Sequence, residues 1–141
     1  MKFLIFGTLA FVLFISIYGC KKDNSEITNT KRIVITNGIY KGVFKTTDSL
    51  GTQEGEITLK LENGSYECSR NPNKIPAGGS GTFSVDNDSN IQFLDMNIWS
   101  NDFDSYLVLS KIYRYRINDK HLKIFAKRVN NVYYEYELVR L

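Results

Sequence analysis

Apolar and polar residues alternate along most of the chain after residue 38, with the period of two that is typical of half-buried β-strands. The clearest case is a pair of alternating runs joined by Asn63-Gly64. Asn-Gly is the strongest short hairpin signal, because both central residues of a type I′ turn need positive φ. A two-residue turn fixes the register, so we expect Leu61 to lie opposite Tyr66, with apolar partners on one face.

Further alternating segments follow the same pattern, and no stretch keeps a helical apolar period for ten residues. Strands are predicted near residues 38–44, 56–62, 65–69, 82–85, 91–93, 106–117, 122–126 and 134–138. The segment 106–117 is expected to be the longest strand. Short antiparallel strands with one apolar face close on themselves, because an open sheet would leave unpaired edges. The chain is therefore predicted to be all-β, with an eight-stranded antiparallel up-and-down barrel.

The first nineteen residues have a different pattern, in which Lys2 precedes an apolar run from Phe3 to Ile17. A positive start, an apolar segment of this length and a small residue before the processing point are the marks of a secretory signal peptide. Gly19-Cys20 resembles the lipobox of bacterial lipoproteins, in which the peptide is cut before the Cys and the new N-terminal Cys is acylated. A retained transmembrane helix is the alternative, since the run is at the short edge of the length that spans a bilayer.

These patterns divide the chain into a lipoprotein signal peptide (1–19), an acylated Cys20 with a flexible tether (20–37) and a barrel (38–141). The tether is polar in its first half, while Ile33, Val34 and Ile35 near its end are alternatively a short extra strand on the domain. Two or more acyl chains make membrane attachment stable, since each buried methylene adds about 0.8 kcal/mol. We therefore expect a membrane partner through the N-terminal lipid anchor.

Several segments of the expected barrel carry a family resemblance, namely residues 38–44, 79–83, 91–93, 99–104 and 133–138. They resemble the small lipocalin-like lipoproteins common in Bacteroides-type bacteria. The resemblance covers nearly the whole domain and implies a lipocalin-like barrel, with Ser110-Lys111 where that family frequently has a Gly-containing bend. It also implies an outer-membrane lipoprotein, on the periplasmic face or at the cell surface, and assigns no activity.

Large aromatic residues dominate the positions expected to face inward. An eight-stranded barrel is just wide enough either to be filled by side chains or to hold one small molecule. Two interpretations of the barrel interior stay open: a packed core, or a phenol-lined cavity for a small apolar or aromatic ligand. The residues expected at such a site are Tyr40, Phe44, Trp99, Tyr113, Tyr115, Tyr134 and Tyr136. Trp99 and Phe103 are expected to plug one barrel end, while Asp102 and Asp104 hold turn amides.

Basic residues gather late in the chain, where Asp119 is the only acid between Lys111 and Arg128. The surface that carries these basic residues is either a solvated wall or a site for an envelope protein or an anionic polymer. Without Lys2, 17 basic residues accompany 15 acidic ones, and their interspersed placement excludes a nucleic-acid-binding domain. Strand alternation places four cations on one outer face, where Glu135 and Glu137 can pair with them across strands: Arg114, Arg116, Lys123 and Lys127.

The residues that usually carry catalysis are scarce. His121 is the only histidine, and Cys68 is the only cysteine besides Cys20. Their strand parities place His121 outside and Cys68 inside the barrel, so they do not form a thiol–imidazole pair. No His and Cys cluster has metal-ligand spacing. We therefore expect no catalytic residue, no metal and no cofactor. The expected function is a non-catalytic binding module, or alternatively a structural or interaction lipoprotein with a packed barrel that engages another envelope component through its outer face.

Overall fold

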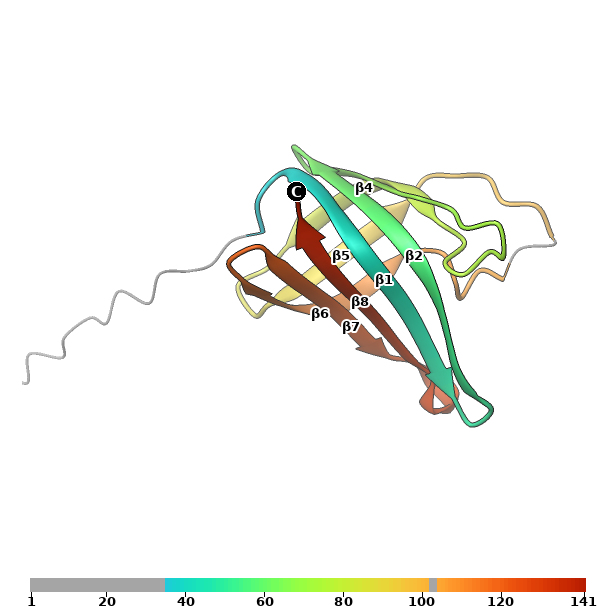
Figure 1. The fold of residues 1–141 in the computed structure, drawn as a ribbon. Coiled ribbons are helices and arrows are strands. Elements are labelled where there is room, and N and C mark those ends of the chain that lie inside the picture. The colour runs from blue at the N-terminus through green and yellow to red at the C-terminus, as the bar shows by residue number, and fades with distance from the viewer. Residues whose placement is uncertain (1–34, 102–103) are drawn as a thin grey trace, which may run out of the picture. The chain divides into compact units, whose positions relative to one another are not determined.

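Eight strands follow one another around a closed barrel in the computed structural model, which describes residues 35–101 and 104–141 (Figure 1). Every strand pairs antiparallel with its neighbours in the chain, and β8 pairs with β1 to close the barrel. The strands are β1 (Gly38–Asp48), β2 (Gly51–Glu62), β3 (Ser65–Cys68), β4 (Gly79–Val85), β5 (Asn90–Asp95), β6 (Lys111–Asn118), β7 (His121–Lys127) and β8 (Tyr133–Arg140), with a 3₁₀ turn η1 (Val129–Asn131) before β8. The predicted eight-stranded antiparallel up-and-down barrel is confirmed.

The hairpin between β2 and β3 has the predicted register. Leu61 lies opposite Tyr66. Asn63 and Gly64 have φ values of 49° and 81°, the positive values that a type I′ turn requires. The apolar partners of this hairpin are buried in the barrel, so the alternation of the sequence correctly predicted which face turns inward.

The predicted strand 106–117 is wrong in its first half. β6 begins at Lys111, where φ is +76° and the chain bends. Residues before this bend pair with the connection between β3 and β4 instead of with β5: Val108 forms an isolated bridge with Gly78, and the amide of Leu109 donates to the Gly78 carbonyl at 2.9 Å. The longest strand is therefore β2, with 12 residues.

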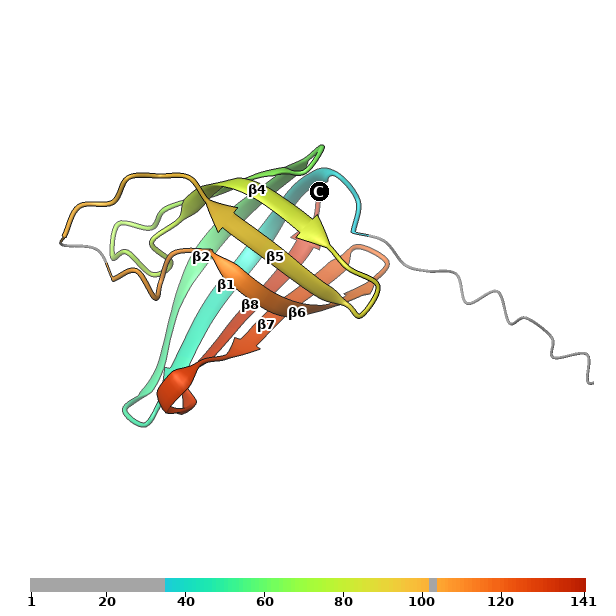
Figure 2. The ribbon, with the colours of Figure 1, turned by 180° about the vertical axis from the view of Figure 1, so that it is seen from behind.

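The two ends of the barrel differ in how the strands are connected. One end, which we call the tight-turn end, has the short turns at residues 63–64, 86–89 and 119–120. The other, which we call the loop end, has the β1–β2 turn, the loops 69–78 and 128–132, and the connection between β5 and β6. Loop 69–78 and the described parts of that connection, residues 96–101 and 104–110, extend together from the barrel in both views (Figures 1 and 2). Asn37 donates to the Asn63 side chain at 2.9 Å, so the chain enters β1 at the tight-turn end.

Ile35 packs into the core at the tight-turn end although it belongs to no strand. At the next residue, the Thr36 carbonyl accepts a hydrogen bond of 2.7 Å from the Tyr40 hydroxyl, which holds this segment against the barrel. The predicted signal peptide, Cys20 and the tether up to residue 34 lie outside the described residues, as do Asp102 and Phe103. None of the described residues forms a helix long and apolar enough to cross a bilayer.

Aromatic rings in mutual contact occupy the barrel interior along a continuous path. Stacked, tilted and edge-on ring pairs of this kind each add about 0.5–1.5 kcal/mol beyond the area that they bury. The ring centroids are separated by 6.3 Å (Phe83–Phe93), 6.0 Å (Phe93–Tyr113), 5.9 Å (Tyr113–Tyr136), 4.6 Å (Tyr136–Phe44) and 6.0 Å (Phe44–Tyr134). Side chains therefore fill the middle of the barrel along this path, which we call the ring path.

Candidate functional site

The loop end of the barrel holds a recess of about 550 Å³, which we call the mouth pocket. Strand β1 contributes Thr46 and β8 contributes Tyr134, while Leu50, Leu107 and Val132 come from the connections around the opening. A recess of this volume is within the range of small-molecule sites, which combine apolar walls with a few polar groups. The mouth pocket is therefore the candidate site for a ligand.

Arg128 lies in the wall of the mouth pocket and is half-buried. Its guanidinium carbon stands 4.5 Å from the centroid of the Tyr113 ring, a cation–π contact. The guanidinium also donates to two backbone carbonyls, that of Ser110 at 3.3 Å and that of Ile112 at 3.2 Å. Among the residues that the structure describes, no carboxylate forms an ion pair with Arg128. Within the described part of the chain, the pocket wall therefore carries a fixed cation that forms no ion pair.

Tyr134 forms part of the base of the mouth pocket, and two further tyrosines, Tyr113 and Tyr136, are buried in the core. Tyr134 lines the pocket and is almost fully buried, and burial followed by the charge of Asp104 raises the pKa of its phenol. Burial also raises the pKa of Tyr113 against the opposing effect of Arg128, and it raises that of Tyr136 well above the usual value. All three phenols are consequently neutral at physiological pH, and that of Tyr134 offers the pocket a hydroxyl group rather than a charge.

Two aspartates at the rim of the mouth pocket hold turn amides. The Asp48 carboxylate accepts a hydrogen bond from the Leu50 amide at 2.7 Å, and the Asp104 carboxylate accepts one from the Tyr106 amide at 2.8 Å. The role predicted for Asp104 is confirmed. The rim therefore carries two negative charges opposite the single cation of the wall.

Of the seven residues predicted at a ligand site, Tyr134 alone lines the mouth pocket. Trp99 lines a different recess of about 480 Å³, and its indole N–H donates to the Asp95 carboxylate at 2.5 Å. Tyr115 is half-buried and packs against the core. The other four are buried in the core: Tyr40, Phe44, Tyr113 and Tyr136.

Arg128 was missed as a site residue, although a signal for it exists. It continues the inward parity of Leu122, Ile124 and Ala126, so β7 directs it toward the inside of the barrel at the loop end. An arginine at an inward position beside a loop is unusual, because a charge is costly to bury without a partner.

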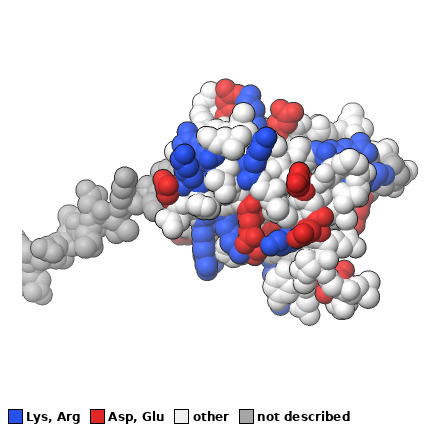
Figure 3. Space-filling model, in the orientation of Figure 1, with Lys and Arg blue, Asp and Glu red and all other residues white. Residues whose placement is uncertain are grey.

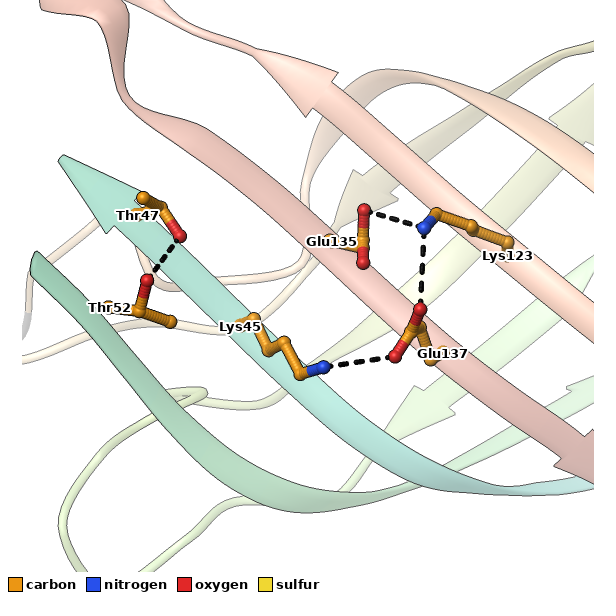
Figure 4. Close-up of polar contacts among 6 residues, drawn as sticks. All are labelled: Lys45, Thr47, Thr52, Lys123, Glu135 and Glu137. Atoms are coloured by element: carbon orange, nitrogen blue, oxygen red, sulfur yellow. Dashed lines mark hydrogen bonds and ion pairs between the residues drawn. The ribbon is translucent and has the colours of Figure 1, made fainter.

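The outer wall formed by β1, β8 and β7 carries a network of ion pairs (Figure 4). The Lys123 ammonium lies 2.8 Å from the Glu135 carboxylate and 3.3 Å from the Glu137 carboxylate, which also binds Lys45 at 3.0 Å. The cross-strand pairing predicted for this face is confirmed at Lys123.

Two other members of the predicted basic face lie against aromatic rings. Arg116 stands 5.4 Å from the centroid of Phe125, and Lys127 stands 5.3 Å from that of Tyr133. On the face shown in Figure 3, cationic and anionic side chains are interspersed. Arg114 contributes an attractive charge to Asp86, whose pKa is lowered chiefly by its hydrogen bonds from Asn90.

Replacing Glu137 with glutamine is expected to lower the melting temperature slightly at low ionic strength. Hydrogen bonds from Lys45 and Lys123 lower the pKa of this carboxyl. Its stabilising effect is therefore present above the pKa of the unfolded carboxyl and is lost as the pH falls through the lower folded pKa. Because the network is exposed, about 1 M salt should screen most of the effect. Thermal unfolding at low and high salt measures it, with Glu67→Gln as the control. An undiminished effect at high salt contradicts the electrostatic explanation.

Cys68 and His121 lie where their parities predict. Cys68 is buried, and desolvation followed by the charge of Asp95 raises the pKa of its thiol to about 12, so the thiol is protonated. His121 is exposed on the outer wall at the β6–β7 turn. Within residues 35–101 and 104–141, no group of three or more His, Cys, Asp or Glu side chains is arranged to hold a metal ion.

The loop end thus brings a fixed cation, the neutral phenol of Tyr134 and apolar walls together in one recess. Comparisons of the chain with protein-family models, with curated proteins and with solved structures gave no match.

Proposed function

We propose that this protein is a lipid-anchored protein of the cell envelope and acts as a non-catalytic binding module, which holds a small apolar or aromatic ligand in the mouth pocket. The observation that carries the proposal is the recess of about 550 Å³ at the loop end. Leu107 and Val132 supply half-buried apolar wall, and Tyr134 supplies a neutral phenol at the base. This combination fits a ligand with an apolar body and few polar groups.

The position of the mouth pocket is compatible with an anchor at Cys20. The described chain enters β1 at the tight-turn end, where Asn37 binds Asn63. The mouth pocket opens at the other end, among the loops. A ligand can therefore reach it without passing the segment that leads into the barrel.

The ring path limits how deep a ligand goes. Phe44 and Tyr136 lie next to Tyr134 in the barrel, and both are fully buried and in ring contact with each other. Protein interiors pack at the density of organic crystals, so these rings leave no room for a second molecule beside them. The proposed ligand therefore lies at the mouth rather than at the centre of the barrel.

Native mass spectrometry of residues 21–141 tests the proposal, since all described contacts lie within residues 35–141. We expect a retained mass in protein purified gently from an envelope-directed expression, and its loss after organic extraction. Thr46→Tyr should fill the pocket and abolish the retained mass, because Thr46 lines the recess. Thr82→Tyr is the matched control, as Thr82 is exposed on β4. A bare polypeptide mass, together with no binding of apolar probes at micromolar concentrations, refutes a ligand site.

The alternative is a structural or interaction lipoprotein that engages another envelope component through its outer face. The ring path favours it, since it shows a barrel interior occupied by side chains. Leu94 and Ile112 add exposed apolar surface, with 61% and 54% of their areas accessible on neighbouring strands. Salt-sensitive binding of residues 21–141 to anionic vesicles would support a basic docking face, and binding at neither low nor high salt would favour a solvated wall.

A further inference from the structure

We infer that the ligand of the mouth pocket carries a single negative charge on an apolar body, and that Arg128 binds its anionic head. This inference rests on the proposed function and names the chemical class of the ligand. The class includes any small amphiphile with one carboxylate, whether it is an alkyl or an aromatic acid.

The first argument is the hydrogen-bonding capacity of Arg128. A guanidinium has five N–H groups and cannot lose its charge in a protein. Two backbone carbonyls, those of Ser110 and Ile112, and the Tyr113 phenol are its partners among the described residues. These partners leave N–H groups for a further acceptor, and none of them is an anion. Burying an arginine halfway without a counter-ion is costly, and an anionic ligand would offset that cost.

The second argument is that the guanidinium is held in place. It lies over the ring of Tyr113, and both of its terminal nitrogens donate to backbone carbonyls around the β6 bend. A long side chain normally loses conformational freedom when it binds an anion, and that loss weakens the contact. Here the protein has already fixed the side chain in the pocket wall, so binding an anion costs little additional order.

The third argument is the apolar surface around the opening. Leu50 and Val129 line the pocket from two different turns, and they are 95% and 80% exposed. Leu107 and Val132 continue this surface into the recess. When the anionic head of the ligand binds Arg128, its apolar body can lie along these side chains and cover them. Burial of such surface contributes about 25 cal/mol per Å².

The aspartates of the rim limit how much negative charge a ligand of the mouth pocket can carry. Asp48 and Asp104 both line the pocket, and the charge of Asp104 already reaches Tyr134. A second negative charge on the ligand would be repelled by these carboxylates, since like charges at short range are unfavourable. The pocket should therefore prefer a monoanion to a dianion such as a phosphate monoester.

A matched pair of probes tests the inference on residues 21–141, the chain that contains all described contacts. Decanoate and decan-1-ol have the same alkyl chain and differ in the charge of the head. Calorimetric titration near neutral pH and at low salt should show decanoate binding about tenfold more tightly, which is the effect of one charge-assisted hydrogen bond. Decyl phosphate should bind more weakly than decanoate.

Three variants locate the effect. Arg128→Gln should remove the preference for decanoate over decan-1-ol, while Arg128→Lys should keep part of the preference because it keeps the charge. Arg116→Gln is the matched control, since it removes one cation from the outer wall of the neighbouring strand. Near-ultraviolet circular dichroism verifies that each variant is folded.

The outcomes separate the inference from the proposed function. Equal binding of decanoate and decan-1-ol by the unchanged protein overturns the anionic class but leaves the apolar binding module intact. A preference that Arg116→Gln abolishes as fully as Arg128→Gln shows a general charge effect and overturns the role of Arg128. If neither probe binds at concentrations up to their solubility, both the inference and the proposed ligand site fail.

Discussion

Replacing Phe44 with alanine is expected to lower the free energy of unfolding by about 3–5 kcal/mol. The Phe44 side chain is fully buried, and its ring contacts those of Tyr134 and Tyr136 with centroid distances of 6.0 and 4.6 Å. Phe44 lies on β1 directly opposite Tyr136 on β8, so it packs along the seam that closes the barrel. The continuous sheet prevents the walls from collapsing into the space that the ring leaves. The cavity therefore remains, and it adds fully to the loss in the free energy of unfolding.

Urea unfolding followed by far-ultraviolet circular dichroism measures this loss. Val43→Ala is the control, because Val43 is the half-buried neighbour whose side chain points to the outer face of the same strand. Folded domains are stable by only about 5–15 kcal/mol, so the Phe44 variant should unfold at a much lower urea concentration, or be unfolded in its absence. A loss below about 1 kcal/mol would mean that Phe44 does not pack as described.

Gly42→Ala is expected to have the second largest effect, a loss of about 2–3 kcal/mol. A Cβ atom at this position would lie 1.8 Å from the carbonyl oxygen of Glu137 and 3.0 Å from the Cα atom of Leu138. Both are backbone atoms of β8, so no side chain can move aside. Strands β1 and β8 must separate to admit one methyl group, and their paired hydrogen bonds weaken with them.

Thermal unfolding compares Gly42→Ala with Lys41→Ala, which changes the exposed residue beside it. A surface substitution of this kind stays within about 0.5 kcal/mol. The difference between the two variants therefore isolates the close approach of β1 and β8. Equal melting temperatures of the two variants would contradict this close approach.

The parts of the fold that depend on local pattern could be predicted from the sequence. The Asn63-Gly64 hairpin was predicted in register because two adjacent residues determine its turn. The extension of β1 and β2 beyond residues 44 and 56 could not be predicted, since the paired stretch from Lys45 to Gly55 is mostly polar and shows no apolar alternation. The start of β6 depends on a contact between Val108 and Gly78, thirty residues apart, that no local pattern records.

Little of the mouth pocket could be predicted from the sequence. Tyr134 was assigned correctly to the inner face and lines the mouth pocket. Arg128 has inward parity, yet its partners are two carbonyls at the β6 bend and the ring of Tyr113 on β6. The volume of the recess likewise depends on how the loops of three hairpins settle beside one another. These are tertiary contacts, and a periodic pattern carries no information about them.

Because of the ring path, the mouth pocket does not continue through the barrel as a channel. Phe93, Tyr113 and Tyr136 cross the interior between the tight-turn end and the mouth pocket, and each is buried against the next. Any molecule held in the mouth pocket would therefore have to enter and leave through the same opening. The β1–β2 turn and residues 104–107 and 128–132 surround that opening, so they would set how long the molecule stays bound. A protein that receives it would have to approach the barrel at this end.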